Sequence, residues 1–195
     1  MSSKLNVFRI VREHFDSLKD YSSHSPKLSA RDLISFFGLP LLLSLLGAIL
    51  SFNLTDALAS MLVNFGSILS ALLLSVLVLV YDQEYKLTYR YESLNPDDKQ
   101  ARQGQFKLWR ELLQEAYANI CYAIIVSISL VIICFIHGAA GDLDREISIP
   151  HFGVVNGSLG AHVLTPMAIA LASNLLLTVL MIVKRFHGLL TSEKP

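Results

Sequence analysis

The chain has 195 residues, and its 16 Lys and Arg are balanced by 16 Asp and Glu, so the formal net charge is zero. Only 16% of the residues are charged and 53% are hydrophobic, whereas a soluble domain carries about 25% charged residues. This composition disfavours a soluble globular protein, a disordered chain and a nucleic-acid binder, which needs a surplus of basic residues. It favours a membrane protein.

The N-terminal segment, residues 4–21, predicts an amphipathic helix. Apolar side chains recur there at spacings of three or four residues with charged residues between them: Phe8, Val11, Phe15 and Leu18. Such a helix either lies among lipid headgroups or packs on other cytoplasmic helices, and its mixed charge signs favour packing. We expect residues 1–31 to form this cytoplasmic helix and a linker that contains Pro26, and residues 32–195 to form a transmembrane domain.

Four stretches without Asp, Glu, Lys or Arg predict four transmembrane helices. They cover residues 33–55, 57–81, 116–137 and 163–183. Each is long enough for a helix of about 20 apolar residues, which crosses about 30 Å of hydrocarbon. The predicted fold class is therefore an all-α polytopic membrane protein with four transmembrane helices.

The basic residues predict the orientation of these helices. All Lys and Arg except Arg145 fall in residues 1–32, 82–115 and 184–195. Because basic residues near transmembrane helices stay on the cytoplasmic side, both termini and the segment 82–115 are expected in the cytoplasm. The sequence thus predicts a multi-pass protein of the cell inner membrane, in contact with the lipid bilayer.

The segment 82–115 predicts a protruding cytoplasmic helical hairpin. Asn95 followed by Pro96 and two acidic residues is typical of a helix start. A helix from Pro96 to His137 would be roughly 63 Å long, about twice the hydrocarbon thickness, so its first half must lie outside the bilayer. Tyrosines at every fourth position from Tyr81 to Tyr89 predict that the preceding helix also leaves the membrane, although alternating residues from Tyr85 to Tyr91 would also suit a short strand.

Four aromatic residues of this hairpin are candidate partner-docking residues: Tyr85, Tyr89, Phe106 and Trp109. They either pack the two limbs of the hairpin against each other or form an exposed surface for a soluble cytoplasmic protein. The second alternative rests on the enrichment of Tyr and Trp at interface hot spots.

Polar residues within the predicted transmembrane helices are candidates for interhelical contacts or for the wall of a pore. They are Ser60, Asn64, Ser67, Asn119 and Asn174. Small residues allow close helix approach, and asparagine forms hydrogen bonds between helices. In an oligomer the stripe from Ser60 to Ser75 would alternatively line a water-filled pathway.

No residue points to catalysis, a cofactor or a metal. The spans hold no ionisable group in their interior, and acid–base chemistry or coupled transport needs one. The outer loop, residues 138–162, carries Asp142, Asp144, Glu146, His151 and His162 beside His137. Such a set would suit a divalent cation, but the spacings match no ligand motif and favour a solvated acidic loop. The sequence therefore predicts a protein that is not an enzyme.

A chain of this length with four spans, both termini inside, a cytoplasmic hairpin and no catalytic motif resembles the small membrane subunits of bacterial anti-phage defence systems. In plan it is most similar to the membrane component of the Kiwa system. This resemblance implies a homo-oligomer, such as a tetramer, that senses phage assault and works with a cytoplasmic DNA-binding partner. The expected function is a non-enzymatic sensor or scaffold without direct nucleic-acid binding; the alternative is a small pore or membrane-depolarising effector channel.

Overall fold

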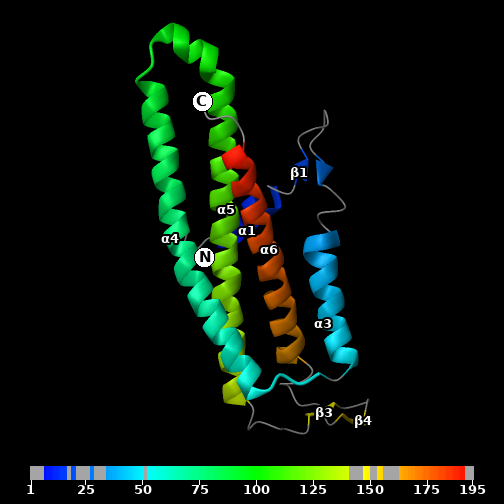
Figure 1. The fold of residues 1–195 in the computed structure, drawn as a ribbon. Coiled ribbons are helices and arrows are strands. Elements are labelled where there is room, and N and C mark those ends of the chain that lie inside the picture. Colours follow the sequence, from blue (N-terminus) through cyan, green and yellow to red (C-terminus); the bar gives the residue numbers. More distant parts are fainter. Residues whose placement is uncertain are drawn as a thin grey trace. The chain divides into compact units, whose positions relative to one another are not determined.

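The computed structural model describes residues 7–16, 19–20, 27–28, 34–50, 52–140, 147–149, 153–155 and 163–191. Almost all of them lie in helices (Figure 1). The chain begins with α1 (Val7–Asp16), the antiparallel pair β1 (Lys19–Asp20) and β2 (Lys27–Leu28), the π-helix η2 (Ile34–Gly38) and α3 (Leu39–Ile49). It continues with α4 (Asp56–Glu92), α5 (Pro96–Ala140), the antiparallel pair β3 (Ile147–Ile149) and β4 (Gly153–Val155), and α6 (Thr165–Thr191).

Three helices are long and apolar enough to cross a membrane. They cover Asp56–Glu92, Pro96–Ala139 and Thr165–Gly188, and a shorter apolar helix covers Ile34–Ile49. The structure confirms the predicted helical fold class, with three helices that could span a membrane by length and composition. It gives the first apolar segment fewer helical residues than the predicted range 33–55. That segment ends early because the chain turns after Ile49, where the Phe52 amide donates to the Gly47 carbonyl at 2.9 Å.

The chain divides into two compact units. The first comprises Met1–Ser29, Ala71–Ile124 and Thr178–Pro195, and the second comprises Ala30–Ser70 and Ile125–Leu177. Each of α4, α5 and α6 contributes residues to both units.

In the second unit, a glycine allows α4 and α5 to approach closely. The Ser127 hydroxyl donates to the Gly66 carbonyl at 2.7 Å. A Cβ at Gly66 would lie 2.8 Å from a Val131 methyl carbon and 3.2 Å from the Ser127 carbonyl oxygen. The absence of a side chain at Gly66 is therefore a condition of this contact.

In the same unit, α3 and η2 lie along α6 in the opposite direction. The Ser44 hydroxyl donates to the Pro166 carbonyl at 2.9 Å, and the Asn174 amide donates to the Phe36 carbonyl at 3.0 Å. Since Phe36 contacts Asn174 and Ser44 contacts Pro166, the segment of η2 and α3 runs antiparallel to α6.

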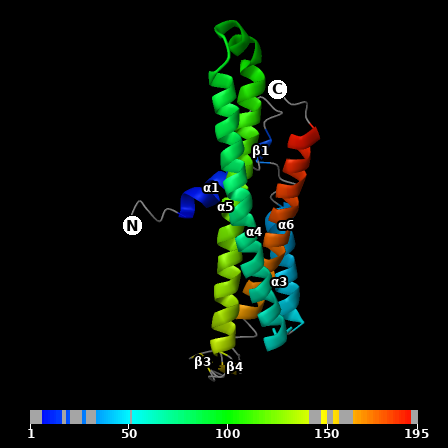
Figure 2. The same ribbon diagram turned by 60° about the vertical axis from the view of Figure 1, so that its left-hand side comes forward.

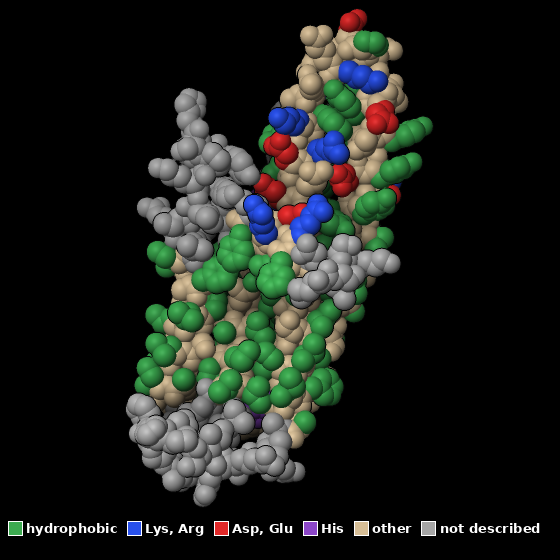
Figure 3. Space-filling model, turned by 180° about the vertical axis from the view of Figure 1, so that it is seen from behind, with side chains coloured by type: hydrophobic (Ala, Val, Ile, Leu, Met, Phe, Trp, Pro, Cys, Tyr) green, Lys and Arg blue, Asp and Glu red, His purple; other side chains and the backbone are tan. Residues whose placement is uncertain are grey.

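In the first unit, the core is formed by the middle of α5. Ala116, Ile120 and Ala123 are fully buried there, and Val80 of α4 is almost fully buried. On the face drawn in Figure 3, charged side chains gather over the hairpin segment of α4 and α5, and hydrophobic side chains predominate on the apolar segments of the long helices.

Three local predictions are corrected by the structure. Helix α1 ends at Asp16, so the predicted helix 4–21 is wrong at Lys19–Asp20, which pair with Lys27–Leu28. The strand alternative for Tyr85 to Tyr91 is wrong, because α4 remains helical to Glu92. The loop predicted at residues 138–162 contains the β3–β4 pair, in which Ser148 lies opposite Val154.

Candidate functional site: the helical hairpin and the α1 contact

The hairpin forms where the sequence predicts it, with its tip at residues 93–95. Helix α5 begins at Pro96, and the Lys99 amide donates to the Asn95 carbonyl at 2.9 Å. Asp97 and Asp98 occupy the first turn, where the helix dipole favours negative charge. The helix then runs unbroken to Ala140.

The aromatic residues of the hairpin divide into a packed set and an exposed set. Tyr91 and Phe106 stack with ring centroids 4.0 Å apart and ring planes at 10°, and the Tyr91 hydroxyl donates to the Lys99 carbonyl at 3.2 Å. Trp109 is half-buried. Phe106 is therefore engaged in joining the two limbs, as the first alternative for the hairpin aromatics expects.

The exposed set is a row of tyrosines on α4, here called the tyrosine ladder, which consists of Tyr81, Tyr85 and Tyr89. Their exposed fractions are 64%, 64% and 66%. Residues four apart on a helix share one face, so the three phenol rings form a continuous strip. Of the four predicted docking residues, Tyr85 and Tyr89 lie on this strip and the other two do not.

Polar contacts join the limbs of the hairpin below its tip. Glu84 of α4 accepts a hydrogen bond from the Gln114 amide at 3.1 Å and lies 3.7 Å from the Arg110 guanidinium. On the other side of α5, the Glu115 carboxylate pairs with Arg185 of α6 at 2.7 Å. A hollow of about 930 Å³, lined by residues of α1, α4 and α5 such as Glu13, Glu84 and Glu111, opens beside these contacts.

Helix α1 packs on α5 through His14, a residue that sequence reasoning missed. The His14 side chain is fully buried, its ring stacks on Tyr122 at 3.9 Å with an angle of 4°, and its Nδ1 lies 2.7 Å from the Asn119 Oδ1. A signal was present in the sequence, because Val7, Val11 and His14 share helical spacing.

The predicted polar residues of the spans fall into two groups. Asn119 and Asn174 are buried and hydrogen-bonded, to His14 and to the Phe36 carbonyl. Ser60, Asn64 and Ser67 are exposed on α4. The structure thus brings the first group into contacts within the chain and leaves the second group on the surface of α4.

No metal centre is formed within the part of the chain that the structure describes, where no three His, Cys, Asp or Glu residues come together to hold an ion. His137 is buried at the end of α5. Asp142, Asp144, Glu146, His151 and His162 lie outside the described residues. No protein-family model, no curated protein sequence and no solved structure matches the chain.

Proposed function

We propose that the chain crosses the inner membrane four times with both termini in the cytoplasm. The segment Ile34–Ile49 has about 24 Å of helix, and its antiparallel contacts with α6 run from Phe36 to Ser44. These contacts support a first crossing, because a segment that lies along a membrane-spanning helix shares its depth. The positive-inside distribution of Lys and Arg supports the orientation.

The proposed function is that of a non-enzymatic, homo-oligomeric sensor or scaffold subunit that recruits or signals to a soluble cytoplasmic protein. The observation that carries this proposal is the exposure of the tyrosine ladder outside the apolar part of α4. Exposed phenol rings on a rigid helix combine large apolar area with a hydrogen-bonding tip at little entropic cost, which is why tyrosine is frequent at interface hot spots. The resemblance to Kiwa-type membrane subunits suggests phage defence as the setting and a DNA-binding partner.

A mechanism follows from the length of α5. It runs for 45 residues from Pro96 at the hairpin tip to Ala140, and Gly104 is tolerated within it. A shift of the membrane-embedded part of such a helix would be carried to the hairpin, because one continuous ladder of backbone hydrogen bonds joins the two parts. Membrane perturbation would thus be presented to the docked partner as a movement of the hairpin.

The test is co-purification from native membranes. In the double variant Tyr85→Ala/Tyr89→Ala, we expect the partner captured by the wild-type chain to be lost at unchanged membrane expression. Gln83→Ala, an exposed change on the same helix off the ladder, should retain it. Partner binding that survives removal of residues 85–110 would refute the docking function.

The alternative function, a small pore or depolarising effector, is favoured by the exposed stripe of α4. Ser60, Asn64 and Ser67 are polar, lie within an apolar helix and are exposed. In an oligomer they would provide uncharged hydrogen-bonding walls. Recording from purified protein in planar bilayers discriminates between the two functions, since the absence of any conductance rules out the pore.

A further inference from the structure

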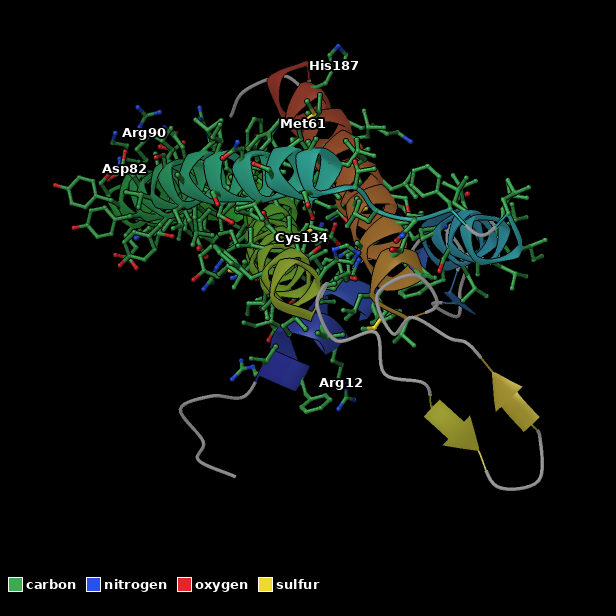
Figure 4. All side chains as sticks on the ribbon, turned by 90° about the horizontal axis from the view of Figure 1, so that it is seen from below. Arg12, Met61, Asp82, Arg90, Cys134 and His187 are labelled. Atoms are coloured by element: carbon green, nitrogen blue, oxygen red, sulfur yellow. The ribbon has the colours of Figure 1, made fainter. Side chains whose placement is uncertain are left out.

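Among the described residues of α1, His14 is the most deeply buried against α5. Val7 and Phe8 are 41% and 74% exposed, whereas His14 is fully buried. Figure 2 shows α1 extending sideways from α5, and Figure 4 shows Arg12 on the side of α1 that is turned away from α5. Loss of the fit of the His14 ring against Tyr122 and Asn119 would therefore weaken the docking of α1 on α5.

Full burial of the His14 side chain disfavours a charged imidazole at this site. The Asn119 Oδ1 can only accept a hydrogen bond, so the His14 Nδ1 at 2.7 Å is the donor. Burial lowers the pKa of His14 from 6.5 to about 4; the hydrogen bond to Asn119 raises it and the nearby Arg185 lowers it further. Protonation would place a second positive charge beside the Arg185 guanidinium in a buried site.

Among the residues that the structure describes, the groups around His14 come from three helices. Helix α5 provides Asn119 and Tyr122. Helix α6 provides Arg185, which forms an ion pair with Glu115 of α5. On α1 itself, the Phe15 ring lies edge-on at 6.0 Å, and Glu13 is exposed and lines the hollow beside the hairpin.

We propose that His14 is a proton-operated latch, which holds α1 on α5 when its imidazole is neutral and releases α1 when the imidazole is protonated. The latch reports acidification on the side of the membrane where α1 lies. It acts on α1 and does not require that the tyrosine ladder bind a partner, so it goes beyond the proposed function.

The direction of the pH effect follows from proton linkage. The undocked helix binds a proton on His14 with a pKa near 6.5 and the docked helix with a pKa of about 4. The docked state is therefore fully favoured above pH 6.5, and this preference is lost as the pH falls toward 4. Between pH 7.5 and pH 5, the docking constant should fall about thirtyfold.

Spin-label distances in the full chain test the proposal. Labels at Arg12→Cys on α1 and Lys107→Cys on α5, in a background with Cys121→Ser and Cys134→Ala and reconstituted in lipid nanodiscs, should give one narrow distance at pH 7.5. A broad distribution should replace it at pH 5. An unchanged narrow distance down to pH 4 would overturn the latch.

Two variants assign the effect to His14. His14→Phe keeps the stacked ring and His14→Gln keeps an amide donor for Asn119, and neither can titrate, so the distance distribution of each should not change with pH. A pH response equal to that of the wild type in either variant overturns the proposal. The ¹³Cε1 resonance of His14 in the wild-type chain is an independent measurement, because a midpoint between 4 and 6.5 supports the latch and a midpoint of 6.5 overturns it.

Discussion

Gly66 is the residue whose size sets the distance between α4 and α5 in the second unit. In Gly66→Ala, the new Cβ would lie 2.8 Å from a Val131 methyl carbon and 3.2 Å from a backbone oxygen. The helices must move apart and the Ser127 hydrogen bond must lengthen. We expect the free energy of unfolding to fall by about 1–3 kcal/mol, measured by SDS titration of the purified protein followed by circular dichroism.

Gly104 provides the matched control for this substitution. It lies in α5 and is exposed, and a Cβ added there meets nothing within 4 Å. Gly104→Ala should leave the protein equally stable or raise the free energy of unfolding by up to about 1 kcal/mol, because alanine favours the helix. Equal destabilisation by both alanines would show that α4 and α5 do not approach through Gly66.

Asn174 supports a second test at this scale. In Asn174→Leu, the donor to the Phe36 carbonyl is lost, and we expect the free energy of unfolding to fall by about 0.6–1.7 kcal/mol, the range of hydrogen bonds between membrane helices. Ser75→Ala is the control, since the Ser75 hydroxyl donates to the Ala71 carbonyl of its own helix and its loss should change stability little. The same SDS titration compares the two variants.

The sequence could predict that Asn119 and Asn174 form contacts, but it could not predict their partners. A buried amide in an apolar helix must be hydrogen-bonded, which made an interhelical role the natural interpretation. Asn174 bonds a backbone carbonyl in η2, whose π-helical geometry leaves no mark in the sequence. Asn119 bonds His14 of α1, which is not part of the predicted apolar stripe of Phe8, Val11, Phe15 and Leu18.

The hairpin of α4 and α5 depends on the stacked pair Tyr91 and Phe106. Phe106→Ala should lower the free energy of unfolding by about 0.5–1.5 kcal/mol because the aromatic pair is lost, and by a further amount because less apolar area is buried. Amide hydrogen exchange at residues 93–99 should accelerate accordingly, because the tip would open more often. In Tyr89→Ala, which changes an exposed ladder residue, exchange at the tip should stay at the wild-type rate.

A faster exchange in both variants would mean that the ladder also holds the hairpin together, and its role as a free docking surface would then be lost. Exchange unchanged in Phe106→Ala would instead show that the polar contacts of Glu84 with Gln114 and Arg110 hold the limbs without the aromatic pair.

The long helices can be predicted from the sequence because the residues that mark a helix start lie next to one another in the chain. The cap at Asn95, the proline at N1 and the acidic first turn fix the start of α5. The end of α1 was not predictable from periodicity, because Leu18 continues the apolar spacing past Asp16, and the pairing of Lys19–Asp20 with Lys27–Leu28 depends on a second segment of chain. Such non-local pairing leaves no periodic signal in either short segment.

Across the molecule, the helices differ in whether the chain itself buries their asparagine side chains. The amides of Asn119 and Asn174 are buried by the chain itself, whereas Asn64 is exposed on an apolar helix. An amide that faces hydrocarbon without a partner costs free energy. Contact with a second copy or with water in a pore removes that cost, and both belong to the proposed oligomer.

Substitution of Asn64 separates these outcomes. If α4 forms the contact between copies, Asn64→Leu should weaken self-association in nanodiscs by about 3- to 20-fold, the equivalent of 0.6–1.7 kcal/mol for a hydrogen bond between membrane helices. Met61→Leu, an exposed apolar change on the same helix (Figure 4), should leave it unchanged. Native mass spectrometry over a range of protein-to-lipid ratios measures both. If Asn64→Leu keeps the oligomer but lowers conductance in planar bilayers, then Asn64 faces water and the pore function replaces the scaffold.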